Sequence, residues 1–387
     1  MKLTDGYIGD VLALIQNGVN CKQNKSGMGE KITRIETIAD SSFNYDKTGF
    51  AQLDEKQKTK AKLEVGDILF SHINSPIHVG KTAVYNGAEP LYHGINLLRL
   101  RTIKEVDCRY FNMFLVSLFQ SGYWRRTAKQ SVNQASVNQT DIKSVPFSYP
   151  PLAEQQRIVA RLDAAFAEID EAINNIKLKD TKLDQFKLIT LSDTFKDNNW
   201  DNIRLGDCIF YEKKNSKGSS LPYVGMENIS SGSMELIGEI TVPKKPKSSF
   251  YFNNSHVLFG RLRPYLRKVL VPDFEGQCSN EVFCIKPKAN VVREFLAYWL
   301  LEQNISSKIE ATSTGTRMPR ANMNSLLEFN FPTPSIDEQK KIISKLNLIF
   351  TNIDRAKKAL AKSKENYLAL KSAILDQELQ PPQSEAA

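Results

Sequence analysis

Hydrophobic residues recur every three or four positions along two long stretches of the chain, which is the pattern of an amphipathic helix. Every seam position of the second stretch lies 184 residues after one of the first. The spacing continues for about five heptads and predicts two helices that pair as a coiled coil. The predicted seams are Ile158, Leu162, Ala165, Ile169, Ala172, Ile176, Lys179, Leu183, Phe186 and Thr190, and then Ile342, Leu346, Ile349, Ile353, Ala356, Leu360, Ser363, Tyr367, Leu370 and Ile374.

The same junction precedes both helices. Residues 150–158 read Pro-Pro-Leu-Ala-Glu-Gln-Gln-Arg-Ile, and residues 334–342 read Pro-Ser-Ile-Asp-Glu-Gln-Lys-Lys-Ile. Proline suits the positions just before or at a helix start, and Glu154 places negative charge in the first turn, where the helix dipole favours it. The fixed offset, which also relates Phe111 to Phe295 and Phe147 to Phe331, indicates an internal duplication.

The two helices are expected to run antiparallel. A helix of about 37 residues is roughly 55 Å long at 1.5 Å per residue, which is more than one small domain covers. The other copy is the natural partner for its apolar stripe, although each helix could instead pack on its own domain. Only about five residues, between Phe195 and Trp200, join the first helix to the second globular region. A parallel pair would need a longer connection.

The regions before each helix have mixed α/β patterns, so the expected fold class is α+β. The first region contains candidate strands at 68–71, 83–85 and 96–101, a helical pattern at 110–124 and a polar loop at 130–140. The second contains candidate strands at 223–229 and 257–260, a helical pattern at 293–301 and a loop at 312–322. The expected divisions are globular regions 1–150 and 200–332, helices 151–195 and 333–376, and a disordered tail 377–387.

Charge adds a modest signal for nucleic acid. Residues 1–149 hold 19 basic and 14 acidic residues, and residues 200–331 hold 17 and 13, so both globular regions are basic. No apolar run is long enough to span a bilayer and the N-terminus has no signal-peptide core, so a cytoplasmic protein is expected. The five cysteines form no Cys-x-x-Cys pair and are expected to be free, buried thiols.

No catalytic constellation is legible in the sequence. There is no Asn-Pro-Pro-Tyr or Asp-Pro-Pro-Tyr motif for adenine methylation and no glycine-rich nucleotide fingerprint. The four histidines lack metal-ligand spacing, so no metal site is expected. The pattern indicates a recognition protein that binds no cofactor of its own.

Candidate DNA contacts are side chains of the types that read base edges or bind phosphates. Arginine or lysine suits guanine and phosphate, and asparagine or glutamine suits adenine. Each candidate has an ordinary alternative as a solvated turn residue or a structural ion pair. The candidates are His72, Lys81, Lys129, Gln130, Asn133, Gln134 and Asn138 in the first region, and Arg261, Arg263, Arg267, Lys268, Arg317, Arg320 and Asn322 in the second.

The repeated junction and the long helices after it resemble the specificity subunit of type I restriction-modification enzymes, over essentially the full chain. The second copy departs from the first at Ser335 and Asp337. The resemblance implies that the globular regions are target recognition domains and that the helices are conserved spacer regions. These spacers would also contact partner subunits, with candidate residues at the helix junctions: Glu154, Gln155, Arg157, Glu338, Gln339 and Lys341.

The resemblance also implies partners and a target. The partners would be double-stranded DNA, two modification (methyltransferase) subunits and restriction subunits, with S-adenosylmethionine, ATP and Mg²⁺ held by those subunits. The target would be a bipartite, asymmetric DNA sequence with a fixed gap. The alternative from another class is a non-catalytic coiled-coil interaction protein whose two domains bind RNA or protein. A fused type II enzyme is excluded by the missing catalytic motifs.

Overall fold

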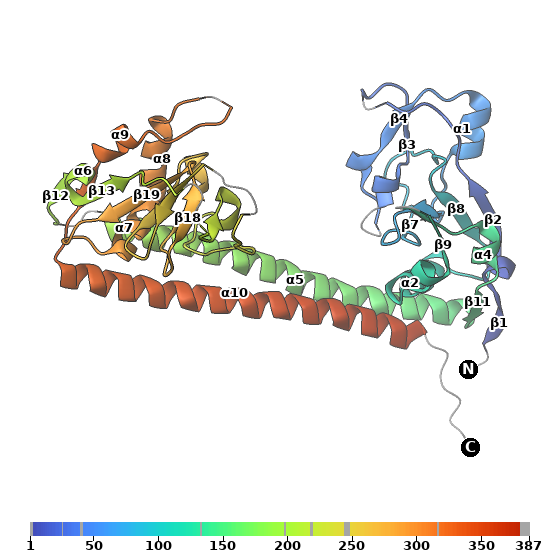
Figure 1. Ribbon diagram of the computed structural model, residues 1–387. Helices are drawn as coiled ribbons and strands as arrows, with labels where there is room; N and C mark the ends of the chain where they lie inside the picture. Colours follow the sequence, from blue (N-terminus) through green and yellow to red (C-terminus); the bar gives the residue numbers. More distant parts are fainter. Residues whose placement is uncertain are drawn as a thin grey trace, which may run out of the picture. The chain divides into compact units, whose positions relative to one another are not determined.

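The computed structural model describes residues 3–24, 26–38, 42–131, 134–196, 199–216, 220–243, 248–315 and 317–379. The chain divides into two compact units. Unit 1 comprises Met1–Asn175 with Ser363–Ala387, and unit 2 comprises Ile176–Lys362. Each unit therefore holds one globular domain, half of the first long helix and half of the second. Both units mix helices and strands, as the α+β expectation requires (Figure 1).

Unit 1 is built around a four-stranded antiparallel sheet in the order β2-β8-β5-β7. The strands are β2 (Leu12–Asn17), β8 (Leu98–Thr102), β5 (Ile68–Phe70) and β7 (Thr82–Val84). A second ladder pairs β1 (Thr4–Tyr7) with β11 (Pro146–Tyr149), so the two ends of the domain lie together. The other elements are η1 (Ile8–Val11), β3 (Glu30–Ile32), η2 (Ile35–Ile38), η3 (Tyr45–Lys47), β4 (Gly49–Ala51), α1 (Glu55–Ala61), β6 (Ile73–Asn74), α2 (Cys108–Gln120), α3 (Tyr123–Thr127), β9 (Lys129–Ser131), β10 (Gln134–Ser136) and α4 (Gln139–Lys143).

Unit 2 repeats this plan. Its four-stranded sheet has the order β13-β19-β16-β17, and β12 pairs with β20 as β1 pairs with β11. These strands are β12 (Asn202–Arg204), β13 (Ile209–Glu212), β16 (Val257–Gly260), β17 (Val269–Leu270), β19 (Val282–Pro287) and β20 (Asn330–Pro332). The other elements are α6 (Leu205–Cys208), β14 (Tyr223–Val224), η4 (Met226–Asn228), β15 (Ser249–Phe252), η5 (Pro264–Leu266), β18 (Gly276–Ser279), α7 (Arg293–Leu301), α8 (Gln303–Ala311) and α9 (Met323–Leu327).

The duplication extends into the cores. Phe111 of α2 packs edge-on against Phe147 of β11, with ring centroids 5.3 Å apart. Phe295 of α7 packs in the same way on Phe331 of β20, at 5.9 Å. All four rings are fully buried. The sequence offset of 184 residues is therefore a structural equivalence, and the predicted internal repeat is confirmed.

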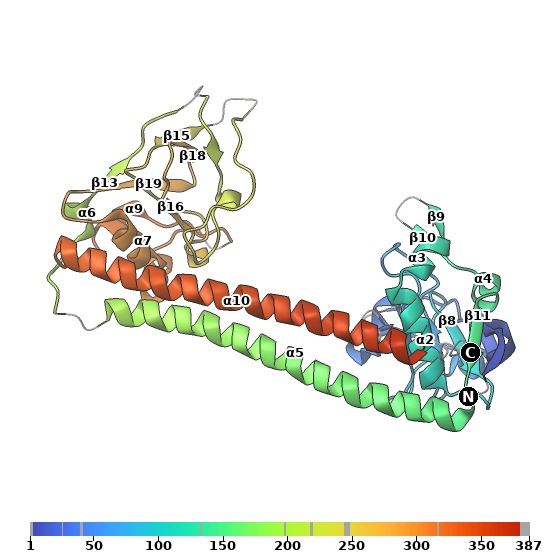
Figure 2. The same cartoon turned by 90° about the horizontal axis from the view of Figure 1, so that it is seen from below.

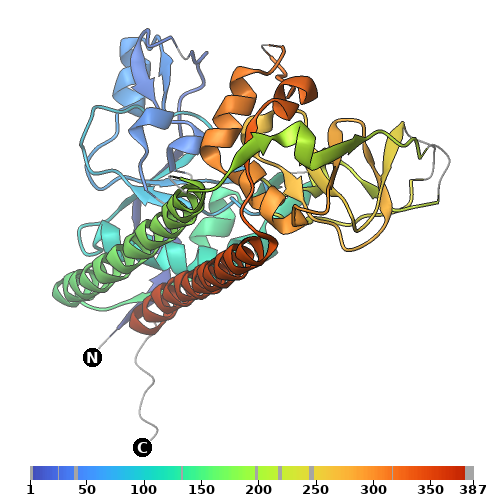
Figure 3. The same cartoon turned by 90° about the vertical axis from the view of Figure 1, so that its left-hand side faces the viewer.

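The long helices are α5 (Leu152–Phe195) and α10 (Ile336–Leu379), each of 44 residues. In unit 1, Arg161 pairs with Glu378 and Asp170 with Lys371, so residue numbers in α10 decrease as those in α5 increase. In unit 2, Asp184 pairs with Lys357 and Lys187 with Asp354. The helices are therefore antiparallel in both units, as predicted, and within each unit they lie side by side (Figures 2 and 3).

The predicted helix seam is partly wrong. Phe186 and Leu370 are 52% and 46% exposed, and Lys179 faces solvent. Positions 180 and 187 turn toward the partner helix in place of 179 and 186, and opposite charges meet there: Lys357 Nζ lies 3.5 Å from Asp180, and Lys187 Nζ lies 4.0 Å from Asp354. A straight α-helix drifts by about 20° per heptad relative to a strict 3.5-residue repeat, so a strict heptad assignment departs from the contact face over several heptads.

Four local predictions also need correction. The expected strand over 223–229 is the two-residue strand β14, and the 3-10 helix η4 follows it. The expected helix over 110–124 is two helices, because Gly122 between them adopts a left-handed φ of 74°. The expected loop at 130–140 contains the β9 and β10 strands and the start of α4. Residues 377–379, expected in a disordered tail, complete α10, where Leu379 packs on the unit 1 core. Residues 380–387 lie outside the described residues.

The cysteines and the helices bear on two further expectations. All five cysteines are free; Cys208, Cys278 and Cys284 are buried, whereas Cys21 and Cys108 are only partly covered. None of the helices in the described ranges combines the length and apolar character needed to cross a membrane.

Candidate nucleic-acid interface

A short antiparallel ladder follows the central core strand in both units. In unit 1 it consists of β6, β10 and β9, with Ser136 placed between Ile73 and Lys129. In unit 2, Arg320 lies in the same way between Leu262 and Thr314. The two predicted polar loops therefore occupy equivalent places in the two domains.

Backbone hydrogen bonds fix the residue equivalence in this ladder. The Val137 N–H donates to the His72 carbonyl at 2.9 Å, and the Ala321 N–H donates to the Arg261 carbonyl at 2.9 Å. His72 thus corresponds to Arg261, and two residues later Asn74 corresponds to Arg263. One backbone frame carries different side chains in the two domains.

In unit 1 the ladder borders a hollow of about 440 Å³. Its walls come from the segments around β6, β7, β8 and η2 and carry mainly polar side chains. They include Gln23, Arg34, Asn74, His78, Lys81 and Asn96. A second hollow of about 330 Å³ shares Arg34 and includes Lys47. Amide, imidazole and cationic groups and the Glu36 carboxylate thus gather at one place, although they are far apart in the sequence.

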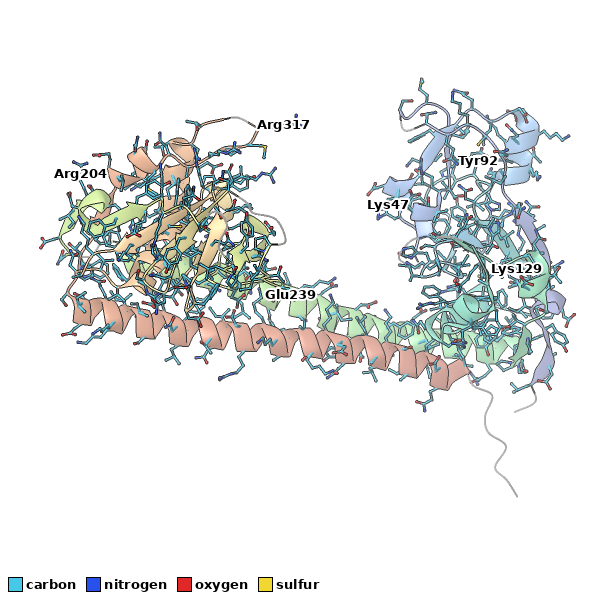
Figure 4. The ribbon with its side chains drawn as sticks, viewed as in Figure 1. Lys47, Tyr92, Lys129, Arg204, Glu239 and Arg317 are labelled. Carbon is cyan, nitrogen blue, oxygen red and sulfur yellow. The ribbon has the colours of Figure 1, made fainter. Side chains whose placement is uncertain are left out.

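The predicted contacts of unit 1 are placed as follows. Lys81 lines the larger hollow, and Lys129, Gln130 and Gln134 are exposed on the β9–β10 hairpin (Figure 4 labels Lys129). Gln130 Nε2 also donates to the Arg125 carbonyl at 3.4 Å. His72 is buried, and burial lowers its pKa to about 4, so this ring is a neutral core group. Asn133 lies outside the described residues.

In unit 2, two predicted arginines are exposed and two basic residues have structural partners. Among the described residues nothing pairs with the side chains of Arg263 and Arg317, and Arg317 lies at the tip of the loop before α9 (Figure 4). Arg320 instead forms a bidentate pair with Glu281, with N···O distances of 2.9–3.1 Å. Lys268 Nζ donates to the carbonyls of Met226 and Ile229 at 2.6 and 2.7 Å.

The other two basic residues of this segment are partly enclosed. Arg267 is half-buried, and its Nη1 donates to the Leu301 carbonyl at 3.3 Å. Burial lowers the pKa of its guanidinium. Arg261 lies 6.0 Å from the centre of the Phe283 ring, and its buried Nε has no partner among the described residues. Arg263 is thus the most available cation of residues 261–268.

Asn138 and Asn322 act as helix caps. The Asn138 side chain accepts from the Asp141 N–H at 2.8 Å at the start of α4, and the Asn322 side chain accepts from the Asn324 N–H at 3.0 Å at the start of α9. Asparagine is a favoured N-cap because its oxygen satisfies an otherwise unpaired amide. The repeat therefore supplies a structural reason for both residues.

The helix junctions contain a duplicated buried glutamine. Gln155 Oε1 accepts from the Asp107 N–H at 2.8 Å, and its Nε2 donates to the carbonyls of Glu105 and Pro150 at 3.0 and 2.8 Å. Gln339 makes the same three bonds, to the Val292 N–H and to the Asn290 and Pro334 carbonyls, at 2.8–2.9 Å. Both side chains are fully buried, so the expectation that they contact a partner is wrong: they fasten each helix to its domain.

The other junction residues lie at the surface. Glu154 forms ion pairs with Arg157 at 3.3 Å and Arg161 at 3.8 Å. Glu338 accepts from the Trp200 indole N–H at 2.9 Å, and Lys341 is exposed. Arg157, Glu338 and Lys341 are therefore accessible to a partner, whereas Glu154 is largely covered by its own pairs.

Sequence reasoning missed Arg34, Lys47 and Asn74. They come from three separate segments that the fold brings to neighbouring walls, and no local spacing marks them. Asn74 had one available signal, since it lies four residues after Phe70, as Arg263 lies four residues after the corresponding Phe259.

Comparisons with known proteins agree with the repeated fold. The family model described as the type I restriction modification DNA specificity domain matches twice, at residues 6–178 and 198–366. The provisionally named MjaX type I restriction enzyme specificity subunit of Methanocaldococcus jannaschii is 31% identical over 93% of this chain and 90% of its own length. The EcoKI specificity subunit of Escherichia coli K12 is 28% identical over 45% of this chain and 39% of its own length.

Solved structures show the same fold at lower identity. A chain from a study of complex assembly and conformational transition in the type I restriction-modification system has a TM-score of 0.75 at 17% identity, covering 98% of both chains. The HsdS subunit from Thermoanaerobacter tengcongensis has a TM-score of 0.59 at 15% identity, covering 98% of this chain and 97% of its own. The alternative of an unrelated interaction protein has no support here. With two copies of the family domain and a relative matched over nearly its whole length, the chain belongs to the specificity subunits of type I restriction-modification systems.

Proposed function

We propose that this chain is the non-catalytic DNA-reading subunit of its system, and that residues 1–150 and 200–332 are its two target recognition domains. This proposal rests on the repeated ladder, which presents different side chains at equivalent positions in the two domains. Two domains that share one backbone arrangement but carry different side chains suit a DNA target made of two different half-sites. Different side chains recognise different base edges in the major groove, whereas phosphate contacts only position the protein.

The helix pair then sets the distance between the half-sites. Each helix of 44 residues is about 66 Å long at 1.5 Å per residue. The spacer regions 151–195 and 333–376, with the exposed junction residues Arg157, Glu338 and Lys341, supply two related surfaces. Two related surfaces suit two copies of one modification subunit, to which restriction subunits can be added. Those partners would supply S-adenosylmethionine, ATP, Mg²⁺ and the chemistry.

Reconstitution tests this proposal. The chain is co-expressed with the modification subunit of its own system, and the native mass of the purified complex is measured. Transfer of labelled methyl groups to adenine in DNA is then measured with and without the chain. We expect one copy of this chain per two modification subunits, and methylation only when the chain is present. The same sites methylated by the modification subunit alone would contradict the proposal.

A further inference from the structure

Asn74 and Arg263 occupy the same position in the two domains. Asn74 lies four residues after Phe70, and Arg263 lies four residues after the corresponding Phe259. Each faces the equivalent residue of the hairpin: Asn74 is the strand partner of Ala135, and the Arg263 N–H donates to the Pro319 carbonyl at 2.8 Å. The two side chains belong to different base-reading classes, since asparagine pairs with two atoms of adenine and arginine with two atoms of guanine.

The Arg263 guanidinium is available, and its backbone is firmly held. The residue is exposed and has no side-chain partner within the described ranges. Its φ of 51°, with 47° at Arg267, is a left-handed conformation that no other non-glycine residue adopts in the described part of the chain. The Leu266 N–H donates to its carbonyl at 2.9 Å. Unusual backbone conformations of this kind concentrate at functional sites, and here one fixes the exit direction of an unpaired guanidinium.

The Asn74 amide is oriented but not saturated. Its Nδ2 donates to Ser71 Oγ at 3.1 Å, and its Oδ1 accepts from the Ser75 N–H at 2.8 Å. An asparagine amide has two donor hydrogens and two acceptor lone pairs, so one of each remains. Those are the two groups that an adenine requires. Arg34, Glu36 and Lys81 line the same hollow, and Arg34 Nε lies 3.4 Å from the Glu36 carboxylate.

We propose that Asn74 and Arg263 are equivalent specificity-determining residues, with Asn74 reading an adenine in one half-site and Arg263 a guanine in the other. This inference rests on the proposed function. It makes unit 2 specific for a G·C pair at one position and unit 1 specific for an A·T pair at one position. The pseudo-repeat thus produces an asymmetric target from a symmetric frame.

The test uses the complete complex with its modification subunits. The target of the unaltered complex is mapped first, and binding is then measured on duplexes in which each specified base pair is replaced in turn. Arg263→Ala should weaken binding to the native duplex about tenfold or more and should lose discrimination at one G·C pair only. Arg263→Lys keeps the charge and can still donate to guanine, but it lacks the planar fork, so it should retain more of this discrimination than Arg263→Ala and less than the unaltered protein. Asn74→Ala should behave likewise at one A·T pair in the other half-site.

Matched controls are Arg204→Ala, an exposed arginine of unit 2 that pairs with Glu328, and Asn17→Ala, an exposed asparagine of unit 1. Both should leave every base preference unchanged. Uniform weakening on all duplexes, with the salt dependence reduced by about one charge, would identify a phosphate contact and overturn the inference. Unchanged binding would overturn it too. If the unaltered complex shows no split target, the proposed function itself fails. If it shows a split target but the variants keep every base preference, only the inference about Asn74 and Arg263 fails.

Discussion

At the scale of single residues, the two buried glutamines show how the repeat is held together. A glutamine at the fourth helical position can reach back to the chain before the helix and across to the neighbouring domain loop. Gln155 and Gln339 do both, with three hydrogen bonds each. Buried polar groups need such partners, and removing one partner leaves the others unsatisfied.

Replacing Gln155 with alanine should therefore destabilise unit 1 strongly. The Asp107 amide and two carbonyls would lose their partner in a buried place, at a cost of about 2–4 kcal/mol in the free energy of unfolding. Gln339→Ala should have the same effect in unit 2. Gln156→Ala, at an exposed neighbouring position, is the control. Urea unfolding measures all three, and equal midpoints for the glutamine variants and the control would refute the buried-anchor role.

Two buried histidines make the stability of unit 1 depend on pH. Burial lowers the pKa of His72 and of His93 to about 4, from an ordinary value of 6.5. The unfolded chain therefore takes up protons between pH 6.5 and 4 that the folded chain does not, and stability falls as the pH falls through that window. Each histidine can contribute up to about 3 kcal/mol.

The variant His93→Gln should flatten this dependence, because glutamine can still donate to the Leu97 carbonyl that His93 contacts at 2.8 Å but does not titrate. Unfolding free energies at pH 7.5 and pH 5 should differ less in the variant than in the unaltered protein. An equal loss in both proteins would show that other groups cause the acid sensitivity.

At the scale of elements, the long helices combine an apolar seam near the domains with charged contacts along their middle. Leu346 of α10 is fully buried in the unit 2 core, whereas Phe186 of α5 in the same unit is half exposed. The heptad pattern alone placed both positions in the predicted seam between the helices. Burial separates them, because only apolar area removed from water contributes to stability.

Leu346→Ala should therefore destabilise unit 2 by about 2–5 kcal/mol, the usual cost of removing a buried leucine side chain. Phe186→Ala should change the free energy of unfolding by no more than about 0.5 kcal/mol. Thermal or urea unfolding of the two variants checks the pair. A larger loss for Phe186→Ala would mean that the original heptad assignment describes the helix contact better than the observed burial does.

The sequence predicted regular and repeated features and missed those that depend on distant segments. The helix pair, the duplication and the strands at 68–71 and 257–260 each carry a local pattern. The hollow in unit 1 does not: Arg34 and Asn74 reach neighbouring walls through the fold of separate segments. Likewise, no pattern shows that Arg320 is taken by Glu281 and Lys268 by backbone carbonyls, whereas Arg263 remains available.

At the scale of the whole molecule, the helix pair is proposed to act as a ruler. Residues 173–179 lie between Asp170 and Asp184, and residues 362–368 lie between their ion-pair partners Lys357 and Lys371. Deleting these two heptads together should shorten the pair by about 10 Å, or roughly three base pairs at 3.4 Å each. The gap in the methylated target should shrink accordingly, while both half-sites stay the same. An unchanged gap would contradict the ruler.

Whether both domains read DNA is tested most directly by mapping methylated adenines across a genome in which this chain is co-expressed with its modification subunit. We expect a split motif, with two different half-sites separated by a gap of fixed length. Methylation at a single continuous motif would contradict it, because only one of the two domains would then be reading DNA.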